Sequence, residues 1–299
     1  MPKKNTVKVS ANKEVILSAG SFQSPQILML SGIGDTDELK AQGISVKKAL
    51  PGVGKNLQDH LFFFISSVSL QQEGFNHHLK PLNQILDLVK WLTTHKGALT
   101  VSPLEAYAFF AINNAKSVNL QFHFAPLHIG DGLTADVYNT KTYPTIDGYT
   151  ILPSLIKPKS RGYVGLKSNN PLDAPVIQPN FLSEDDDLQI LLTGAKKALD
   201  VMKANAFDPY RKAIVAPVDQ SDEGIIAHIK NTVETIYHPV GTCKMGNDPM
   251  AVVNDKLQVH GIESLRVVDG SIMPTIVAGN TNAPIIMIAE RAADLILGI

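Results

Sequence analysis

Short apolar runs bounded by small and polar residues mark buried strands near both ends of the chain. Residues 14–18 (EVILS) form one such run, and residues 265–268 form another. Short runs of this kind are typical of parallel strands that are buried on both faces. The pattern predicts a strand in each place, with Ala19-Gly20-Ser21 as the turn after the first strand.

Apolar residues at helical spacing predict six helices. The clearest covers about 184–205, where apolar residues recur every three or four positions. Ser183 is expected as its N-cap, and the acidic residues 184–187 suit the positive end of the helix dipole. A metal site is the alternative reading of this acidic run. The other helices are expected at 26–31 (with Ser24 as N-cap, Pro25 opening and Gly32 ending it), 35–43, 82–93, 222–232 and 283–297 (capped by Thr281 or Asn282).

The remaining apolar stretches read as strands between these helices. They are interrupted by a polar segment at 130–145. No internal repeat, low-complexity tract or flexible linker stands out. The pattern therefore predicts a mixed α/β (α+β) chain with further strands at 44–49, 62–70, 120–125, 162–167 and 175–178.

Composition places the chain among ordinary globular proteins. Its 299 residues suggest about two domains, and 44% hydrophobic with 18% charged residues excludes a disordered, collagen-like or coiled-coil chain. The net charge of −1 gives no electrostatic footprint for a nucleic-acid partner. A single cysteine, Cys243, excludes an internal disulfide framework and a cysteine-based zinc cluster.

Targeting signals are not evident in the residues given. No apolar run reaches the roughly 18 residues of a membrane span, and the first residues contain no signal-peptide core. We therefore expect a cytoplasmic chain without a transmembrane segment. The first residues also contain no leading structured unit, so the chain is expected to begin within a domain.

Three stretches are rich in glycine and small polar residues: 20–34, 237–246 and 269–284. Each is expected where a buried strand gives way to a helix or a loop, which is where open α/β sheets bind ligands. Taken singly, each has a plain structural alternative. The glycines can be turn residues, His238 can be a hydrogen-bonded core histidine, and Asn280 with Asn282 can be a helix cap.

Several familiar motifs are absent from the sequence. Residues 52–56 (GVGKN) lack the flanking residues of a phosphate-binding loop, and no G-x-S-x-G elbow of a serine hydrolase is present. His77-His78 has no patterned companion ligands, so no metal site is expected there. No complete G-x-G-x-x-G follows a strand.

Together, five segments resemble the glucose–methanol–choline (GMC) family of flavin-dependent alcohol oxidoreductases, most closely its choline-dehydrogenase-like branch. Residues 20–34 (GSFQSPQILMLSGIG) match the second signature of that family at essentially every fixed position. The other matches follow in the family's order: 51–60 (PGVGKNLQDH), 238–246 (HPVGTCKMG), 267–274 (VVDGSIMP) and 279–284 (GNTNAP).

The resemblance implies a domain plan. It implies part of a Rossmann-like FAD-binding domain and a substrate domain with an antiparallel sheet and covering helices. Residues 1–60 would be a remnant of the FAD-binding domain, 61–220 the substrate-binding domain, and 221–299 the C-terminal part of the FAD-binding domain with the catalytic residues. Since the family's glycine-rich unit is absent, the chain resembles the C-terminal portion of such an enzyme. A truncated fragment that is not catalytic and cannot bind FAD alone is the alternative.

The resemblance also implies an alcohol oxidation by hydride transfer to FAD. His238 would be the base that takes the hydroxyl proton, which suits a group whose ordinary pKa is about 6.5. Asn280 would position the substrate oxygen by hydrogen bonding, because an amide is not a base. No metal is implied. The residues implied to contact FAD are Ala19, Gly20, Tyr237, Asp269, Gly270, Thr281, Asn282 and Ala283.

The sequence leaves the substrate and the electron acceptor open. The substrate would be a small-molecule alcohol, and the acceptor would be oxygen, a quinone or another molecule. A quaternary-ammonium alcohol such as choline would need an aromatic cage or a carboxylate. The side chains available are Trp91, Phe62, Phe63, Phe64, Phe122, Phe124 and Glu105. Ordinary core aromatics are the alternative and the favoured interpretation.

Overall fold

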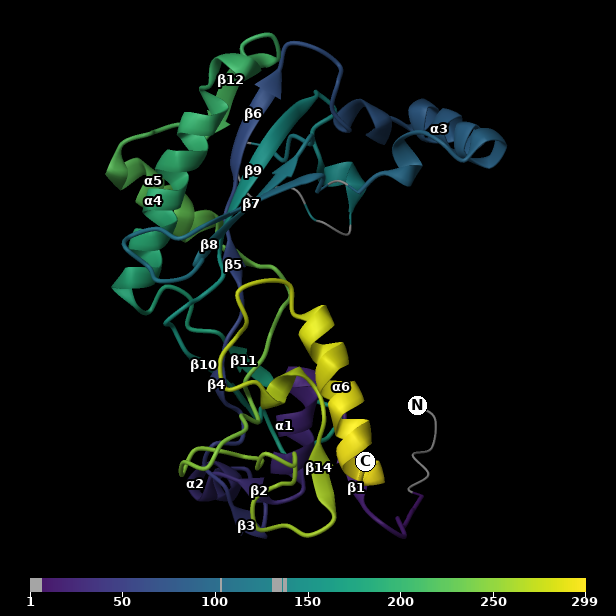
Figure 1. Ribbon diagram of the computed structural model, residues 1–299, viewed down its shortest axis with the longest axis vertical. Helices are drawn as coiled ribbons and strands as arrows, with labels where there is room; N and C mark the ends of the chain where they lie inside the picture. The colour runs from purple at the N-terminus through teal and green to yellow at the C-terminus, as the bar shows by residue number, and fades with distance from the viewer. Residues whose placement is uncertain (1–6, 103, 131–135, 137–138) are drawn as a thin grey trace. The chain divides into compact units, whose positions relative to one another are not determined.

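The computed structural model describes residues 7–102, 104–130, 136 and 139–299. These residues form two compact units. The first unit contains the described residues of Met1–Asp59, with Ser160–Phe181 and His238–Ile299. The second unit contains the described residues of His60–Lys159, with Leu182–Tyr237. Each unit is drawn in Figure 1.

The first unit combines small sheets with three helices. Its apolar core joins residues from the start, the middle and the end of the chain, among them Leu28, Val53, Cys243, Val267 and Ala292. Its elements are β1 (Val15–Leu17), α1 (Gly20–Leu30), β2 (Ile33–Gly34), α2 (Thr36–Ala41), β3 (Lys48–Ala49), β4 (Lys55–Leu57), β10 (Gly162–Gly165), β11 (Val176–Gln178), β14 (Leu265–Val267), η5 (Gly270–Ile272) and α6 (Asn282–Leu297).

The two predicted parallel strands are present and pair with each other. β1 lies parallel to β14, with Ile16 opposite Arg266. The Arg266 Nε donates to the Glu14 carboxylate at 2.7 Å, which ties the start of β1 to its partner strand. Val15 and Ile16 are nevertheless 48% and 43% exposed. Parallel strands are normally buried on both faces, so the faces of this small sheet are covered less than is usual.

Helix α1 begins earlier than the sequence pattern predicts. It starts at Gly20, so Pro25 lies inside the helix and not in its first turn, and Ser24 is not its N-cap. A proline inside a helix leaves the carbonyl four residues earlier without its N–H donor. Here that carbonyl belongs to Ser21, and the buried hydroxyl of Thr242 donates to it at 2.6 Å. This bond is the physical reason that the helix continues through Pro25.

The second unit is built on a seven-stranded sheet with covering helices. Its main path runs β12-β6-β9-β5-β13, and β8 joins β9 and carries β7 at its other edge. All its strand pairs are antiparallel. Its elements are β5 (Leu61–Phe62), β6 (Ile65–Ser69), η1 (Asn76–Leu79), α3 (Pro81–Thr94), η2 (Ala98–Thr100), β7 (Ala106–Phe110), β8 (Leu120–Ala125), η3 (Thr140–Thr142), β9 (Gly148–Leu155), α4 (Asp185–Met202), η4 (Asn205–Phe207), β12 (Arg211–Ala216), α5 (Asp222–Thr232) and β13 (Glu234–Thr235).

Helix α4 covers this sheet, and α5 packs against α4 (Figure 1). A Cβ added at Gly194 in α4 would stand 3.0 Å from the side chain of Leu120 in β8, so this glycine allows a close approach of helix and sheet. α4 begins at Asp185 with Glu184 as N-cap and without a side-chain cap bond from Ser183. Asp187 is buried and accepts a hydrogen bond from the Lys159 backbone N at 2.8 Å.

Several strands differ from the expectation. β7, β9 and β12 were not predicted, and the stretch predicted at 62–70 is two strands, β5 and β6. β9 contains Pro153, a residue that argues against an inner strand. In the sheet Pro153 lies opposite the break between β5 and β6, where the Phe63 N–H donates to the Pro153 carbonyl at 3.3 Å. In the first unit, the strand predicted at 44–49 covers only Lys48–Ala49. Part of the polar segment predicted at 130–145 lies outside the described residues.

The prediction of a mixed α/β chain is confirmed. The compact units do not follow the predicted segment bounds, since residues 160–181 belong to the first unit, where β10 pairs with β4. Residues 221–237 belong to the second unit, where β13 pairs with β5. The roles of the segments as cofactor and substrate domains stay predictions. Within the described residues, no helix has the length and apolar character needed to cross a bilayer.

Candidate functional site: the motif segments of the first unit

Asp269 joins the start of α1 to η5. Its buried carboxylate accepts from the Gly20 N–H at 2.9 Å and from the Ser24 hydroxyl at 2.5 Å, both through Oδ2. Its Oδ1 accepts from the Ser271 N–H at 2.8 Å. An anion at a helix start is stabilised by the helix dipole and by the free N–H groups there. In this unit the protein's own carboxylate takes that place at α1.

The segment that begins at His238 lies between two of the other motif segments. On one side Val240 and Gln58 exchange backbone hydrogen bonds of 2.9 and 3.0 Å. On the other side the Cys243 N–H donates to the Ser271 carbonyl at 2.9 Å. The Ser21 hydroxyl in α1 donates to the Pro239 carbonyl at 2.6 Å. Four segments far apart in the sequence therefore meet around residues 239–243.

The Gln58 side chain fastens the same junction. Its Nε2 donates to the Pro274 carbonyl at 3.1 Å, and its Oε1 accepts from the Ile276 N–H at 3.2 Å. The Asn56 Nδ2 donates to the Gly241 carbonyl at 3.2 Å. Both amides thus bond backbone groups of the segments on either side. Their role is to hold the shape of the junction.

Four of the motif glycines differ in what surrounds them. Gly54 and Gly241 have positive φ, and a Cβ at either would stand 2.5 Å or less from a backbone carbonyl oxygen. These glycines serve close packing between segments. Gly20 (φ 81°) and Gly279, by contrast, have no atom within 4 Å of an added Cβ. Open space lies beside these two positions of the first unit.

His238 is held by its backbone, and its imidazole is half-buried. Its N–H donates to the Asp59 carboxylate at 2.9 Å. Burial lowers the pKa of His238 below its usual value, because desolvation disfavours the charged imidazolium. The neutral, proton-accepting form is therefore favoured near neutral pH. Tyr237, the last residue of the second unit, precedes it with φ 65°, a conformation that is rare for an aromatic residue, and its side chain is exposed.

Helix α6 begins next to this junction. Its first turn contributes Ile285, which approaches Gly270 and packs in a cluster with buried Val240. Thr281 is its N-cap residue and makes no side-chain cap bond, and Asn282 and Ala283 are exposed. Pro284 has no N–H, and the Ile285 N–H already bonds the Thr281 carbonyl. The first-turn N–H groups of Asn282 and Ala283 are thus available to a partner.

The predicted site residues other than Tyr237 separate into three groups. Ala19, Gly20, Asp269 and Gly270 come together through the Asp269 bonds at the start of α1. Asn280, which is exposed, and the N-cap residue Thr281 precede α6, whose first two residues are Asn282 and Ala283. His238 lies two residues before Val240, whose side chain contacts the first turn of α6 through Ile285. Whether these residues bind a cofactor or act in a reaction stays a prediction.

Cys243 is fully buried, and burial raises the pKa of its thiol. A protonated, inaccessible thiol is a packing residue and not a nucleophile. No group of three or more histidine, cysteine, aspartate or glutamate side chains could hold a metal ion within the described part of the chain.

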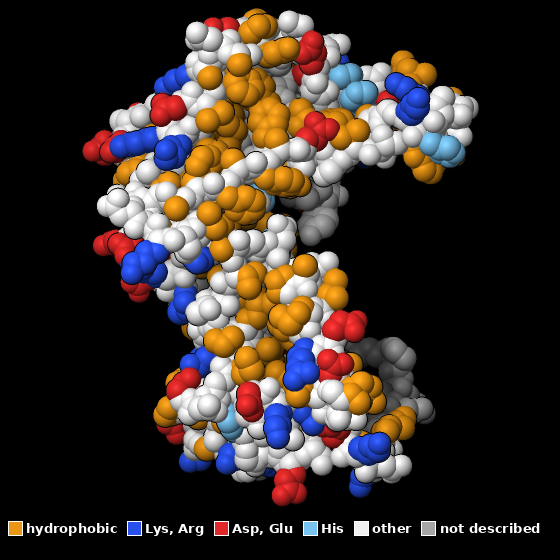
Figure 2. All heavy atoms as spheres, in the orientation of Figure 1, with side chains coloured by type: hydrophobic (Ala, Val, Ile, Leu, Met, Phe, Trp, Pro, Cys, Tyr) orange, Lys and Arg blue, Asp and Glu red, His pale blue; other side chains and the backbone are white. Residues whose placement is uncertain are grey.

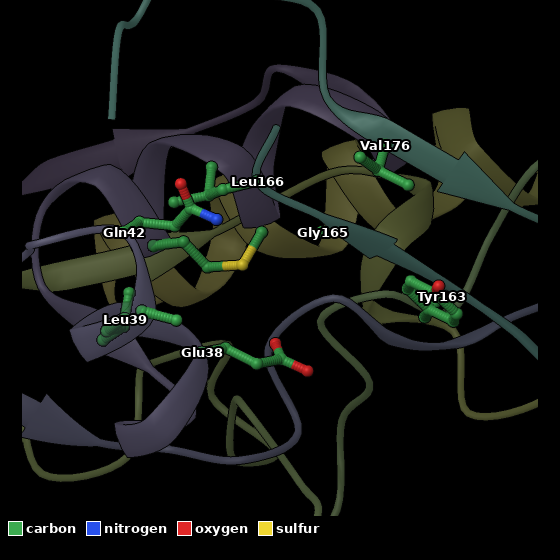
Figure 3. Close-up of a pocket in the computed structure, with 9 residues that line it drawn as sticks. Glu38, Leu39, Gln42, Tyr163, Gly165, Leu166 and Val176 are labelled. Carbon is green, nitrogen blue, oxygen red and sulfur yellow. The ribbon is translucent and has the colours of Figure 1, made fainter. Parts of the chain in front are cut away.

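A pocket of about 250 Å³ lies elsewhere in the first unit. It is bordered by α2, β10 and β11, and Figure 3 shows Glu38, Leu39 and Tyr163 around it. Glu38 pairs with Lys55, whose ammonium lies 5.3 Å from the centre of the Tyr163 ring. Its lining, so far as the structure describes it, contains none of the predicted site residues.

The aromatic residues named for a choline cage belong to separate clusters of the second unit. Trp91 lies on α3, with its ring edge-to-face against His95. Phe122 packs on Phe110, and Phe124 stacks on Tyr149. Phe63 and Phe64 are fully buried and contact His228, Phe62 is partly buried in β5, and Glu105 is exposed.

Sequence comparisons match the chain to one family. Residues 1–62 and 158–289 match the N-terminal and C-terminal sequence models described as GMC oxidoreductase, which together cover about two thirds of the chain. The chain belongs to the GMC oxidoreductase family. The resemblance read from its motifs is thus confirmed at the level of the family.

Relatives and solved structures agree with this assignment. Alcohol dehydrogenase [acceptor] of Pseudomonas putida is 42% identical over 97% of this chain and 52% of its own length. Mitochondrial choline dehydrogenase of Homo sapiens is 41% identical over 96% of this chain and 48% of its own. A variant of Aspergillus oryzae formate oxidase, in which FAD modification was studied, superposes with a TM-score of 0.86 at 26% identity, over 96% of this chain and 54% of that one. The chain thus spans about half the length of these relatives.

Three residues of the junction were not singled out from the sequence: Asp59, Gln58 and Thr242. All three lie within recognised motif segments, but their roles depend on partners about 180 to 220 residues away. No local signal in the sequence marks them, because Gln58 and Asp59 stand in a polar stretch with His60 and their burial is evident only in the structure.

Proposed function

We propose that this chain supplies the catalytic residues and part of the flavin site of an FAD-dependent oxidoreductase that oxidises a small alcohol to a carbonyl compound. The observation that supports this most is the junction around residues 239–243. There His238 is half-buried and its neutral form is favoured. Both His238 and the N-terminus of α6, which has no side-chain cap, adjoin the apolar cluster that contains Val240. Family membership and the alcohol-oxidising relatives agree with the proposal.

The residues present fit an FAD molecule in two respects. The free N–H groups of Asn282 and Ala283 at the positive end of α6 suit the negative charge that a reduced flavin carries. Open space beside Gly20 and Gly279 allows a planar ligand to approach the backbone. The sequence predicts that Asp269 contacts FAD. In the structure its carboxylate already accepts hydrogen bonds from three donors in α1 and η5. We assign it the positioning of α1.

FAD, when bound, supplies the acceptor for a hydride. The chain's own residues do the rest. The neutral imidazole of His238 takes the proton of the substrate hydroxyl, which strengthens the donation of hydride from the adjoining carbon. Asn280 donates from its amide to the substrate oxygen and orients it. The Asp59–His238 bond fixes the backbone from which the imidazole extends.

The glycine-rich unit that cradles the FAD diphosphate is not among these 299 residues. We therefore infer that such a unit is needed to complete the site, and β1, which pairs only with β14 among the described strands, offers its second edge to further strands. The alternative is a folded chain with no cofactor and no activity. Both hypotheses agree with the observation that the chain spans about half the length of its relatives.

Flavin retention separates these readings. The purified chain is incubated with excess FAD, desalted, and its visible absorption spectrum is recorded. We expect little flavin on the chain alone and one flavin per chain when a glycine-rich half is supplied. A stoichiometric yellow chain on its own would overturn the need for a second half. Failure to retain flavin in either preparation, with both proteins folded by circular dichroism, would overturn the proposed flavin site.

A further inference from the structure

Helix α3 of the second unit has an unusual orientation for an amphipathic helix. None of its residues is buried, and in Figure 1 it extends away from the sheet of its unit. Its exposed apolar side chains, each between 47% and 66% exposed, are Leu82, Ile85, Leu86, Leu88, Val89 and Leu92. At 100° per residue these six side chains cover one side of the helix.

The polar side of α3 faces the protein. The Asp87 carboxylate accepts from His78 Nδ1 at 2.7 Å, and the Asn83 amide donates to the His77 carbonyl at 2.7 Å. A surface helix of a globular protein normally does the reverse and packs its apolar stripe on the core. The apolar side of α3 is thus left for something outside the unit.

The polar groups within the apolar side are internally satisfied. Thr93 lies among the apolar residues, and its hydroxyl donates to the Val89 carbonyl at 2.8 Å. On the polar side of the helix, the Thr94 hydroxyl donates to the Lys90 carbonyl at 2.6 Å. A surface that offers no unsatisfied donor or acceptor suits hydrocarbon, where an unpaired polar group is costly. It gives little directional bonding to a protein partner.

Charges around α3 favour an anionic surface. Lys80 precedes the helix, Lys90 lies within it and Lys96 follows it, whereas the acidic Asp87 is bonded to His78. Lysine stems can lie along apolar surface while their ammonium groups reach headgroups. Trp91 is partly exposed at the margin of the apolar side, a position that tryptophan favours at membrane interfaces. Figure 2 shows hydrophobic, basic and histidine side chains together where Figure 1 draws α3.

We propose that α3 is an interfacial anchor that lies in the surface of an anionic bilayer with its apolar side in the acyl region. Its 14 residues are about 21 Å long, which is short of the roughly 30 Å hydrocarbon core. The helix therefore lies in the interface, as amphipathic helices do, with Lys90 within it and Lys80 and Lys96 near its two ends. Leu99 and Val101, which follow the helix in the sequence, are exposed as well.

The single tryptophan of the chain makes the test direct. Phosphatidylcholine vesicles with and without phosphatidylglycerol are added to the full chain, and bound protein is measured by flotation. Trp91 emission is recorded with lipids brominated in the acyl chains. We expect binding to the anionic vesicles, a blue shift of Trp91 and quenching by the brominated lipid. Without quenching, the helix does not enter the acyl region and the proposal is overturned.

Two matched variants place the effect on α3. Leu86→Gln with Val89→Gln is expected to weaken vesicle binding at least about tenfold, since burial of each side chain is lost. Ile286→Gln with Met287→Gln removes two similarly exposed apolar residues from α6 and is expected to bind as the unchanged chain does. Equal loss in both, or loss in neither, would overturn the proposal.

A second copy of the chain, or the glycine-rich unit inferred above, is the competing occupant of this surface. Vesicle binding that is lost when that unit is supplied would overturn the proposal in favour of the unit. A blue shift of Trp91 that grows with protein concentration in the absence of lipid would overturn the proposal in favour of a second copy. If circular dichroism shows that the α3 variant is not folded, the proposal is tested by the quenching of Trp91 in the unchanged chain. None of these readouts depends on flavin or on turnover.

Discussion

At the scale of single residues, the roles of the side chains at the junction depend on their hydrogen-bond partners. His238 has the residue type and the motif position of a base, and both are legible in the sequence. Asp269 was read from its motif as a cofactor contact, but its three bonds reach Gly20, Ser24 and Ser271. Two of these partners lie about 245 residues away, which no local pattern reveals.

Asp269→Asn tests the positioning role. An amide cannot replace a carboxylate that accepts from a hydroxyl and two N–H groups, and each bond to a charged group is worth about 1.5–3 kcal/mol. We expect a loss of at least about 2 kcal/mol in the free energy of unfolding, measured by urea denaturation.

Ser24→Ala removes one of the same bonds and is expected to cost about 1.5–3 kcal/mol in the unchanged background. In the Asp269→Asn background its cost should shrink, because the two residues share the bond. Strictly additive losses would show that Ser24 and Asp269 are not coupled.

A second residue, His228, links stability to pH. Its Nε2–H donates to the Phe64 carbonyl at 2.7 Å, and its ring packs against Phe63 and Phe64. Burial lowers the pKa of His228, and the Phe64 bond opposes this only in part. Below the ordinary value of about 6.5 the unfolded chain therefore binds more protons than the folded one. Stability is full above that pH and declines as the pH falls.

We expect the thermal unfolding midpoint to decrease as the pH is lowered from about 7.5 to about 5.5, and to decrease less in the His228→Gln variant. His95, which is exposed on the surface at the end of α3, provides the control through His95→Gln. An equal pH dependence in the His228→Gln variant and the unchanged chain would contradict the assignment.

At the scale of elements, the local sequence pattern predicts the bounds of a helix or strand correctly where local interactions determine them. β8 and α5 have the predicted bounds, since each combines a regular pattern with clear flanking residues. α1 differs because the Thr242 hydroxyl, 221 residues away, makes Pro25 acceptable inside the helix. β9 was missed because Pro153 fits an inner strand only opposite the interruption between β5 and β6. In both cases a distant partner overrides a sound local rule.

Thr242→Val tests this account of α1. The change keeps the shape of the side chain but leaves the buried Ser21 carbonyl without a donor, which costs about 1–3 kcal/mol. Pro25→Ala in the same protein restores an N–H that can reach that carbonyl. We therefore expect Pro25→Ala to recover most of the loss in the free energy of unfolding, by urea denaturation. A double variant no more stable than Thr242→Val alone would contradict it.

At the scale of the whole molecule, the sequence indicated the family and the order of the motif segments. It did not indicate how the segments divide between the units, because residues 160–181 join the first unit through β10 and β4. Val15 and Ile16 of β1 are exposed in a two-stranded parallel sheet, although parallel strands are normally buried on both faces. The chain spans about half the length of its relatives.

The most direct test of the account is the reduction of bound flavin by an alcohol. The chain is combined with the N-terminal half of the Pseudomonas putida relative and FAD, and loss of the visible flavin band is followed anaerobically after adding choline or a primary aliphatic alcohol. The account predicts that His238→Ala retains its flavin but is reduced about 10²- to 10⁴-fold more slowly. Reduction of the His238→Ala protein at the unchanged rate would contradict the account.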